Sequence, residues 1–379
     1  MGKGTNFSGQ PVLSQLIKLM DRQKINTLAS KSGANYYTKH LDGYSHLVVM
    51  LYAVLSNLRS LREVCLGFAA NATRMNHLGI DHMICRSTLS DANKRRQSSF
   101  FGSIYRSLYN RYASLLSDSL SKKEHSMKLY VMDSTTISLF SQILRGTGRN
   151  PNNGKKEGGI KAHTIIEENI DLPVFVDYTA GVVHDHELMQ RIFDLPYGSF
   201  IAFDMGYTDY MIWKQLDEKG YKFVCRRIVR RTDDGKGTVE FVTNVLDPEE
   251  MSAEQVCETY RRRWTIESLY KKLKQNFPLK YFLGDNVNAI EIQIWVTMIA
   301  YLLLRVMQVK SMSKLAFSNI VMLTRVTLGA YIDLITLLNC PKLDWNLIKQ
   351  QRARWVMNQN IRQLDLFDAQ EGLLLDTRT

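Results

Sequence analysis

The amino-acid sequence predicts an α/β protein in which helices flank a mixed β-sheet, with one helical region before the sheet and another after it. Apolar residues in the first third recur at helical spacing, as at Leu47, Leu51 and Leu55. From about residue 127, short apolar runs bounded by polar residues begin to alternate with helical patterns. Three consecutive strands followed by alternating helices and strands are typical of a mixed sheet covered by helices.

The composition is that of a globular, basic protein. The chain has 379 residues, of which 45% are hydrophobic and 23% are charged. These values exclude a disordered or fibrous chain, and the length suits two or three domains. Lys and Arg number 49 against 37 for Asp and Glu, a formal net charge of +12. This surplus favours a polyanionic partner, nucleic acid before an anionic membrane, and the plain alternative is a soluble basic protein.

The five cysteines are isolated in the sequence and form no C-x-x-C pair. They indicate a reducing compartment and exclude an ordinary zinc ribbon. The first residues contain no apolar segment of the kind found in secretory signals. The longest apolar run, residues 294–304, is shorter than the about 20 residues that span a bilayer. We therefore expect a soluble cytoplasmic protein with no membrane partner, in which this run forms a buried helix.

Residues 1–122 are expected to form a helical N-terminal domain that binds DNA. A short helix from about residue 62 precedes a second helix, for which Ser87 or Thr88 is the expected N-cap. This pair permits a helix-turn-helix with the second helix in a major groove. An amphipathic helix with a solvated basic end explains the pattern equally well. Three basic residues at its end are candidates for DNA contacts: Lys94, Arg95 and Arg96.

Residues 123–325 are expected to form the sheet domain, and residues 326–379 a helical C-terminal region. Strands are predicted over residues 129–133, 160–167, 173–179, 200–204, 221–228 and 238–245. Helices are predicted from Thr208 to about Lys219 and from Ser252 to about Phe277, where Gln255 completes a capping-box pattern. The Gly- and Asn-rich loop after the first strand carries four cations available to phosphates, Arg145, Arg149, Lys155 and Lys156, of which the last three are candidates for DNA contacts.

Two aspartates, Asp133 and Asp204, stand at the carboxyl ends of predicted strands. Because side chains alternate along a strand, Val131 shares a face with Asp133, and Ala202 shares a face with Asp204. Ligands of open α/β sheets gather at these strand ends. A single aspartate there is usually a turn residue, but two in one sheet favour a functional site.

A third acid, Glu267, lies on the helix predicted after Ser252. Four polar residues of this helix lie at positions 0, 3, 7 and 14 counted from the first of them. They therefore fall within roughly 60° of one another around the helix axis: Tyr260, Arg263, Glu267 and Lys274. A neighbouring apolar stripe can pack against the sheet: Ile266, Leu269, Leu273 and Phe277. Ordinary ion pairs on a surface helix are the alternative, but they leave a local excess of cations unexplained: Arg261, Arg262, Arg263, Lys271, Lys272 and Lys274.

Three carboxylates from two strands and one helix can hold two Mg²⁺ ions, with Mn²⁺ as a substitute. Two such ions activate the attacking oxygen and stabilise the leaving oxygen of a displacement at phosphorus. The cations around Glu267 can hold a DNA backbone. Asp133, Asp204 and Glu267 are therefore the candidate catalytic and metal-binding residues.

The spacing of these residues resembles that of DDE transposases of bacterial insertion sequences. Tyr260-x2-Arg263-x3-Glu267-x6-Lys274 matches the Y-R-E-K signature of the branch known as the IS-four family. VMDSTTISLF and FIAFDMGY resemble that family's two aspartate blocks, and GGIKAHTIIEENIDLPVFVDYTAGVVHDHELM resembles the hairpin and third strand between them. The region through Phe101 resembles the helical N-terminal domain of such transposases, so the resemblance covers most of the chain.

The resemblance implies an RNase H-like fold and cut-and-paste transposition. It implies that Asp133, Asp204 and Glu267 form the catalytic triad. It also assigns phosphate binding near the cleaved DNA end to three residues: Tyr260, Arg263 and Lys274. Residues 221–247 leave room for a small β insertion in the catalytic domain.

The function that follows is metal-dependent DNA cleavage at the terminal inverted repeats of an insertion sequence, with transfer of the freed 3′-OH to a second phosphodiester. The expected partner is double-stranded DNA, as element ends and as target, bound by a homodimer. The alternatives are an RNase H-like nuclease without strand transfer and a DNA-binding protein without catalysis. The intact acids at Asp133, Asp204 and Glu267 argue against the second alternative.

Overall fold

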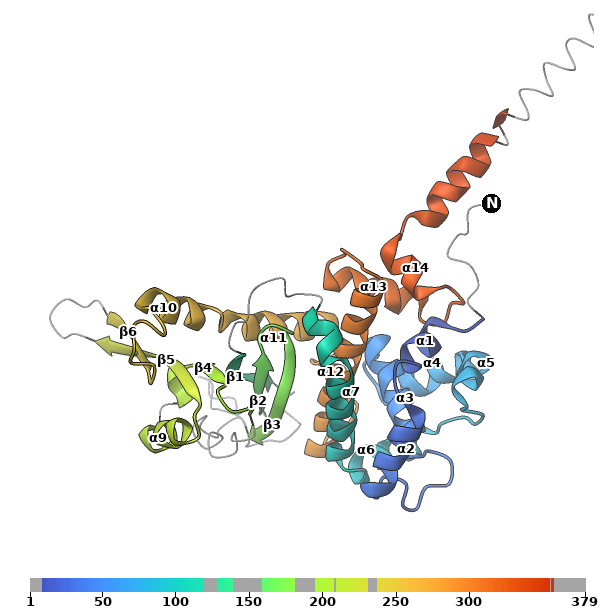
Figure 1. The fold of residues 1–379 in the computed structure, drawn as a ribbon. Helices are drawn as coiled ribbons and strands as arrows, with labels where there is room; N and C mark the ends of the chain where they lie inside the picture. Colours follow the sequence, from blue (N-terminus) through green and yellow to red (C-terminus); the bar gives the residue numbers. More distant parts are fainter. Residues whose placement is uncertain are drawn as a thin grey trace, which may run out of the picture.

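The computed structural model describes residues 9–118, 128–138, 159–180, 195–207, 209–230, 237–354 and 356–357. Figure 1 shows a sheet with helices on its faces beside a larger body of helices. The basic loop with Arg149, Lys155 and Lys156 lies outside the described residues, as does Thr208. The mixed sheet with flanking helices that the sequence predicts is confirmed.

Six strands form the sheet, in the order β3-β2-β1-β4-β5-β6. They are β1 (Leu129–Ser138), β2 (Gly159–Glu167), β3 (Leu172–Ala180), β4 (Phe200–Phe203), β5 (Lys222–Arg230) and β6 (Gly237–Thr243). The first three pair antiparallel, β4 and β5 run parallel to β1, and β6 returns antiparallel to β5. The segment expected as a small β insertion therefore supplies two strands that extend the same sheet.

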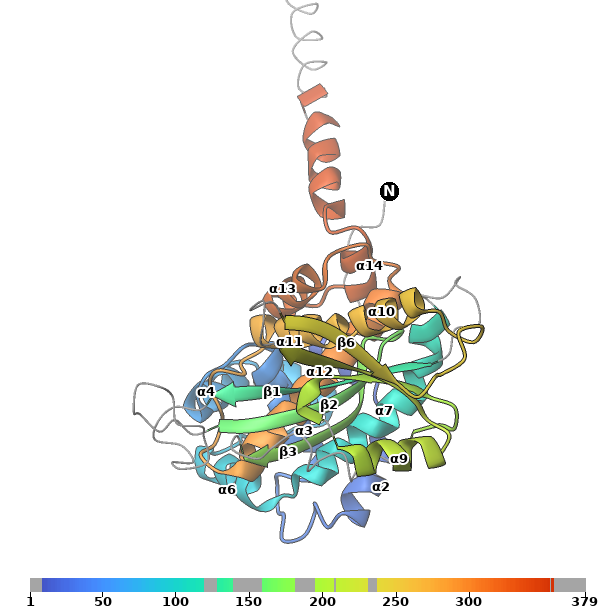
Figure 2. The same ribbon diagram turned by 90° about the vertical axis from the view of Figure 1, so that its left-hand side faces the viewer.

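The two faces of the sheet pack against different helices. On one face lie α10 (Ala253–Arg261) and α11 (Trp264–Asn276), and on the other lies α9 (Tyr210–Glu218), as Figure 2 shows. Val131 and Ala202 belong to the core beneath α10 and α11, whereas Met132 and Ile201 pack in a separate core with Ile212 of α9. This assignment follows the alternation of side chains along each strand.

Helices make up the N-terminal and C-terminal parts of the described chain. Before the sheet come α1 (Val12–Ile17), α2 (Arg22–Lys31), α3 (Gly43–Leu55), α4 (Leu61–Ala70), α5 (Ala72–Met75), the 3₁₀ helix η1 (Asn76–Leu78), α6 (Arg86–Arg95) and α7 (Ser98–Asp118). A second 3₁₀ helix, η2 (Met205–Tyr207), follows β4. After α11 come α12 (Val287–Lys310), α13 (Phe317–Thr327) and α14 (Leu334–Asn339). Residues 343–354 form a further helix that projects from the body (Figure 1).

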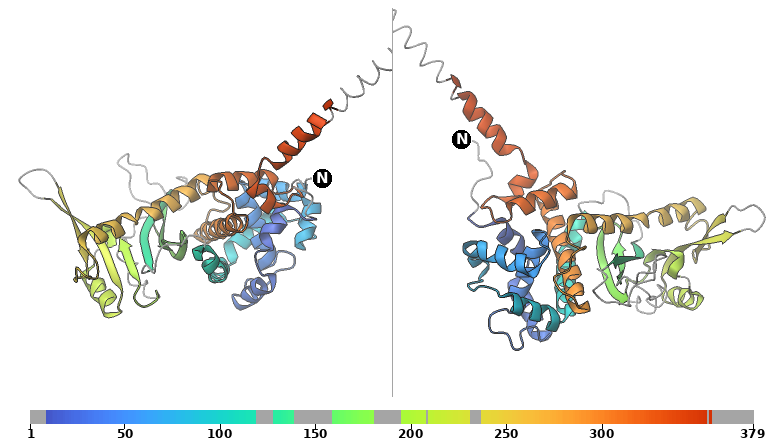
Figure 3. Two further views of the ribbon diagram at one scale, coloured as in Figure 1. Left: turned by 45° about the horizontal axis from the view of Figure 1, so that its top comes forward. Right: turned by 180° about the vertical axis from the view of Figure 1, so that it is seen from behind.

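The long helix α12 lies between the sheet and the N-terminal helices in both views of Figure 3. It packs against α3, α7 and β3. One continuous core holds residues from all three predicted regions, such as Leu51, Val131 and Leu334. By length and composition α12 passes for a membrane-spanning helix, but most of its apolar window is buried inside the protein. The predicted buried helix at residues 294–304 is thus confirmed as the middle of α12.

The predicted helix-turn-helix is wrong for the described residues. α4 ends at Ala70 and α6 begins at Arg86, and the intervening chain contains α5, η1 and a loop. A helix-turn-helix joins its helices by a turn of about three or four residues. The N-cap of α6 is Cys85, which makes no side-chain cap hydrogen bond, so Ser87 and Thr88 lie in the first turn instead.

Arg96, predicted as a DNA contact, is instead a buried structural residue with 6% of its surface exposed. Its guanidinium donates to the carbonyl oxygens of Ala34 and Leu41, both at 2.8 Å, and to His46 Nδ1 at 2.6 Å. His46 Nε2 in turn donates to Asn93 Oδ1 at 2.8 Å, and Asn93 donates to the carbonyl of Leu283 at 2.9 Å. This chain of donors ties α6 to α3 and to the segment before α12.

The protonation of His46 is consistent with this network. Burial, together with the nearby positive charge of Arg96, lowers the pKa of His46 to about 3. The imidazole is therefore neutral near pH 7, with its proton on Nε2 and its Nδ1 lone pair facing the guanidinium. Lys94 and Arg95, by contrast, are exposed and stay candidates for DNA contacts.

We expect Arg96→Ala to lower the free energy of unfolding by about 3 kcal/mol or more, because it leaves two buried carbonyls and a ring nitrogen without donors. Urea unfolding measured by circular dichroism tests this. The matched control is Arg95→Ala, which removes an exposed ion pair with Asp91 at 3.3 Å and should cost less than about 1 kcal/mol. Equal losses for the two variants would contradict the anchoring role.

Candidate active site

The two aspartates meet where β4 ends. β1 and β4 pair in parallel, with Val131 opposite Ala202, and Asp133 and Asp204 each follow two residues later. Asp204 comes directly after β4, as predicted. Asp133 lies within β1, which continues to Ser138 while paired with β2. It therefore stands beside the end of the neighbouring strand and not at the end of its own. Both carboxylates belong to the face covered by α10 and α11.

The helix that carries Glu267 is divided in two. The capping box of Ser252 and Gln255 is present, but α10 ends at Arg261 and α11 begins at Trp264. The break is a tight turn in which the N–H of Arg263 bonds to the carbonyl of Tyr260 at 3.0 Å, a 3₁₀-type bond. The predicted single helix is wrong at this point. The predicted apolar stripe is buried: Ile266, Leu269, Leu273 and Phe277.

Arg263, in this turn, bridges two of the three acids. Its Nη1 lies 3.2 Å from Asp133 Oδ2, and its Nη2 lies 3.1 Å from Glu267 Oε1. The third acid has a separate partner, since the Tyr260 hydroxyl donates to Asp204 Oδ1 at 3.1 Å. Only 6% of the surface of Arg263 is exposed. The structure thus brings five of the predicted site residues together, with the arginine facing the acids.

The electrostatics of the site depend on burial and on mutual repulsion of the acids. Burial raises the pKa of Asp133 to about 6, and Glu267 and Asp204 add to the increase. The backbone N–H of Ser134 and the charge of Arg263 oppose it. Burial would lower the pKa of Arg263, but the neighbouring Tyr260 and Asp133 outweigh burial and raise it. The site therefore holds a permanent positive charge beside a carboxylate that gains a proton easily.

A cavity of about 490 Å³ opens beside Asp133 and Glu267. On its wall, Lys274 Nζ donates to Thr135 Oγ1 at 2.6 Å, and the Tyr270 hydroxyl donates to the backbone carbonyl of Asp133 at 3.0 Å. Thr135 and Tyr270 were not singled out from the sequence. Their spacing could have identified them, because it places each on the same face as a candidate acid. Thr135 is two residues from Asp133 on one strand, and Tyr270 is three residues from Glu267 on one helix.

Most of the cations near Glu267 are paired with acids. Arg261 pairs with Glu258 at 3.3 Å, Arg262 pairs with Glu168, and Lys272 pairs with Asp171 at 2.5 Å. The predicted excess of positive charge on this helix is therefore partly neutralised by other segments. Trp264, at the start of α11, is 58% exposed. The cations that line the cavity are Lys271 and Lys274.

Comparison with known proteins identifies the family. Residues 124–303 match the family model described as Transposase DDE domain, and residues 8–81 match a domain of unknown function (DUF4372). The chain is 27% identical over 260 residues to a protein of Sinorhizobium fredii named as a transposase, y4zB, covering 58% of this chain and 70% of that protein. It is also 27% identical over 252 residues to a Synechocystis sp. protein named as the transposase for insertion sequence element IS4SA, covering 58% and 71%. The chain is a DDE transposase.

The DDE domain of this transposase includes the whole sheet and all three candidate carboxylates. A cryo-EM structure of the piggyBac transposase synaptic complex with hairpin DNA is also similar, with a TM-score of 0.43 and 10% identity over 89% of this chain and 84% of that chain. A likeness this distant informs neither the fold nor the site.

DDE domains use divalent metal ions, and the transposase offers oxygen ligands for them. Within the described ranges, no three His, Cys, Asp or Glu side chains are grouped closely enough to hold a metal. The guanidinium of Arg263 instead supplies the positive charge between Asp133 and Glu267. Asp133 and Glu267 are oxygen donors of the kind that divalent cations prefer, and in this conformation Arg263 stands in for a cation by neutralising both of them.

Arg263→Ala should lower the free energy of unfolding of the transposase by about 3 kcal/mol in EDTA, because Asp133 loses its counter-ion in a mostly buried place. Added Mg²⁺ should restore part of this stability by supplying positive charge. Urea unfolding with and without Mg²⁺ measures both effects. Arg261→Ala, which removes an exposed pair on the same helices, should cost less than about 1 kcal/mol and respond little to Mg²⁺. Similar behaviour of the two variants would refute the stand-in role.

Proposed function

We propose that this transposase cleaves DNA at the terminal inverted repeats of its own insertion sequence and transfers the freed 3′-OH to a second phosphodiester. The observation that supports the proposal is the gathering of Asp133, Asp204 and Glu267 around Arg263 and Tyr260, with Asp133 and Glu267 beside an open cavity. The match to transposases of insertion sequences supports the choice of substrate. Membership of the IS-four branch, on the Y-R-E-K spacing, belongs to the same proposal.

The three carboxylates are the proposed ligands of two divalent ions, Mg²⁺ or Mn²⁺. Two such ions would supply activation of the attacking oxygen and stabilisation of the leaving oxygen. When the carboxylates take up divalent cations, the Arg263 guanidinium no longer has two acids to neutralise. Its planar fork is then available for bidentate binding of a DNA phosphate beside the scissile bond.

Lys274 and Tyr260 are the proposed companions of Arg263 on the DNA. Lys274 lies on the cavity wall, where its ammonium can hold a phosphate as a point charge. Tyr260 can donate its hydroxyl to a phosphate once Asp204 no longer accepts it. The exposed Lys94 and Arg95, and the loop with Arg149, Lys155 and Lys156, are proposed as further backbone contacts.

The proposal also includes the compartment, the oligomeric state and the domain boundaries. We propose a soluble, cytoplasmic protein that acts as a homodimer on two element ends. The predicted boundaries near residues 122 and 325 remain a proposal, with DNA binding assigned to the first region. The alternative of a nuclease without strand transfer shares the fold and the acids. A strand-transfer assay on pre-cleaved element ends separates the two, because a pure nuclease releases no joined product.

Asp133→Asn, Asp204→Asn and Glu267→Gln should each abolish Mg²⁺-dependent cleavage of the element ends, because three ligands share two ions and the loss of one disrupts both sites. Binding of the ends should be largely retained, since the substitutions remove negative charge. Cleavage gels and gel shifts on the same preparations measure the two properties. Glu258→Gln, an exposed acid on α10, is the control and should cleave normally. Near-normal cleavage by any triad variant would remove that residue from the proposed site.

Lys274→Ala should reduce strand transfer on pre-cleaved ends by about tenfold or more, because one phosphate near the reacting oxygen loses its positioning charge. Lys280→Ala, an exposed lysine just beyond α11, is the matched control and should transfer normally. Metal affinity measured by titration calorimetry should be unchanged in both variants. Wild-type transfer by Lys274→Ala would eliminate its role in phosphate binding.

A further inference from the structure

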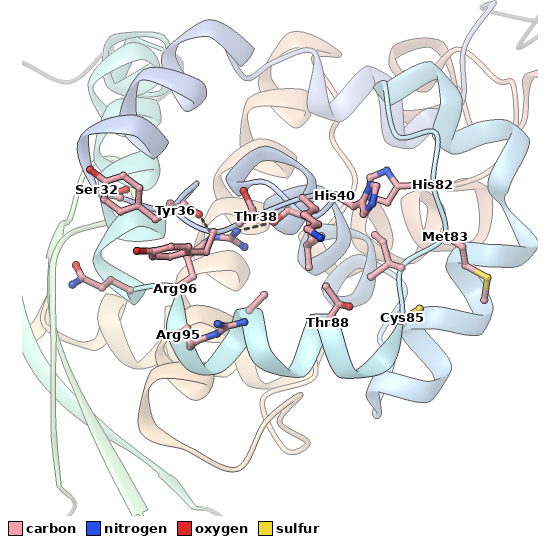
Figure 4. A pocket seen from close by; sticks show the side chains of 18 of the residues that line it. Ser32, Tyr36, Thr38, His40, His82, Met83, Cys85, Thr88, Arg95 and Arg96 are labelled. Atoms are coloured by element: carbon pink, nitrogen blue, oxygen red, sulfur yellow. Dashed lines mark hydrogen bonds between the residues drawn. The ribbon is translucent and has the colours of Figure 1, made fainter.

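A second cavity, of about 870 Å³, lies in the N-terminal helices and apart from the candidate active site. Its walls are the chain between α2 and α3, residues 82–85 and one face of α6, and Figure 4 shows side chains from these segments around the space between them. The volume falls in the usual range for small-molecule and cofactor sites. Most of one wall belongs to the region matched to a domain of unknown function.

The residues that line this cavity carry positive charge and no opposing carboxylate. Four are Lys or Arg, and none is Asp or Glu: Lys31, Lys39, Arg95 and Arg96. Arg96 is committed to the buried network with His46. Arg95 has an exposed ion pair with Asp91 at 3.3 Å, of the kind that gives way readily to another anion. Phosphate is the group that suits such a lining.

Two tyrosines in the chain between α2 and α3 are exposed. Tyr36 is 77% exposed and Tyr37 is fully exposed, which is unusual for large aromatic side chains. Tyr37 adopts a left-handed backbone with φ of +56°, a conformation that is costly for a bulky residue. The ring of Tyr36 lies over Gly33, where a Cβ would approach it to 2.9 Å, so the glycine permits this placement.

We propose that this cavity binds an unpaired nucleotide of the DNA substrate. The base would stack on Tyr36 or Tyr37, and the flanking phosphates would contact Lys31, Lys39 and Arg95. Aromatic faces beside cations are the usual means of binding single strands. A duplex is too wide to enter a space of this size, whereas a nucleotide displaced from a duplex can enter it. The proposal rests on the proposed function in DNA transposition and adds a site for the strand that opens at the element end.

The test measures fluorescence anisotropy of the full-length transposase with a labelled oligothymidine strand about 12 nucleotides long and with a blunt duplex. Tyr36→Ala and Tyr37→Ala together should weaken binding of the strand about fivefold or more, because a stacked base is lost. Tyr36→Phe and Tyr37→Phe keep the ring and should bind as the wild type does. Lys39→Gln should weaken binding of the strand and reduce its salt dependence by about one phosphate contact, unlike Lys18→Gln outside the cavity.

The possible outcomes separate this proposal from the proposed function. Normal duplex binding with a strand affinity that the tyrosine variants leave unchanged would overturn the cavity proposal alone. Binding of neither DNA by the wild type would overturn both. ATP is included as a competitor: if it binds in a tyrosine-dependent manner and oligothymidine does not bind, the site takes free nucleotides and the proposal is wrong. Because the substituted side chains are exposed, unchanged thermal melting should accompany every variant.

Discussion

The two contacts of Arg263 determine how the candidate active site is arranged. Glu267 and Asp204 repel the charge of Asp133, and burial of Asp133 increases the cost of that charge. A guanidinium between Asp133 and Glu267 offsets that cost while no other cation is present. The tight turn between α10 and α11 places Arg263 there, so the interruption of the helix is part of the site.

The position of the sheet relative to the N-terminal helices depends on α12. Asn288 in its first turn donates to the carbonyl oxygens of Asn93 and Arg96 at 2.8 and 2.7 Å, and it accepts from the backbone N–H of Ser98 at 3.0 Å. One amide side chain thus joins the end of α6 to the start of α7. Because β3 also packs against α12, the wall of the second cavity and the catalytic sheet are attached to the same helix.

The strands and the acids could be predicted from sequence because they depend on local patterns. Alternation of side chains placed Asp133 and Asp204 on one face, and helical spacing placed Glu267 and Lys274 on one side of α11 but did not reveal the break that separates them from Tyr260 on α10. The contact partner of each Lys or Arg could not be predicted in this way. The sequence does not show whether a basic side chain contacts water, a backbone carbonyl or a carboxylate. Arg96 is buried only because the chain near Ala34 and Leu41 returns to it.

The surplus of positive charge therefore serves at least two purposes in this chain. Near Glu267, cations such as Arg262 and Lys272 are bound by acids from the turn between β2 and β3, and they hold α11 on the sheet. Around the N-terminal cavity, the lining residues include four cations and no acid, although Arg95 also pairs with Asp91. Like charges placed together destabilise the folded chain unless an anion relieves them. A net charge of +12 alone is no evidence for either arrangement, whereas cations beside exposed tyrosines favour a nucleic-acid ligand at the cavity.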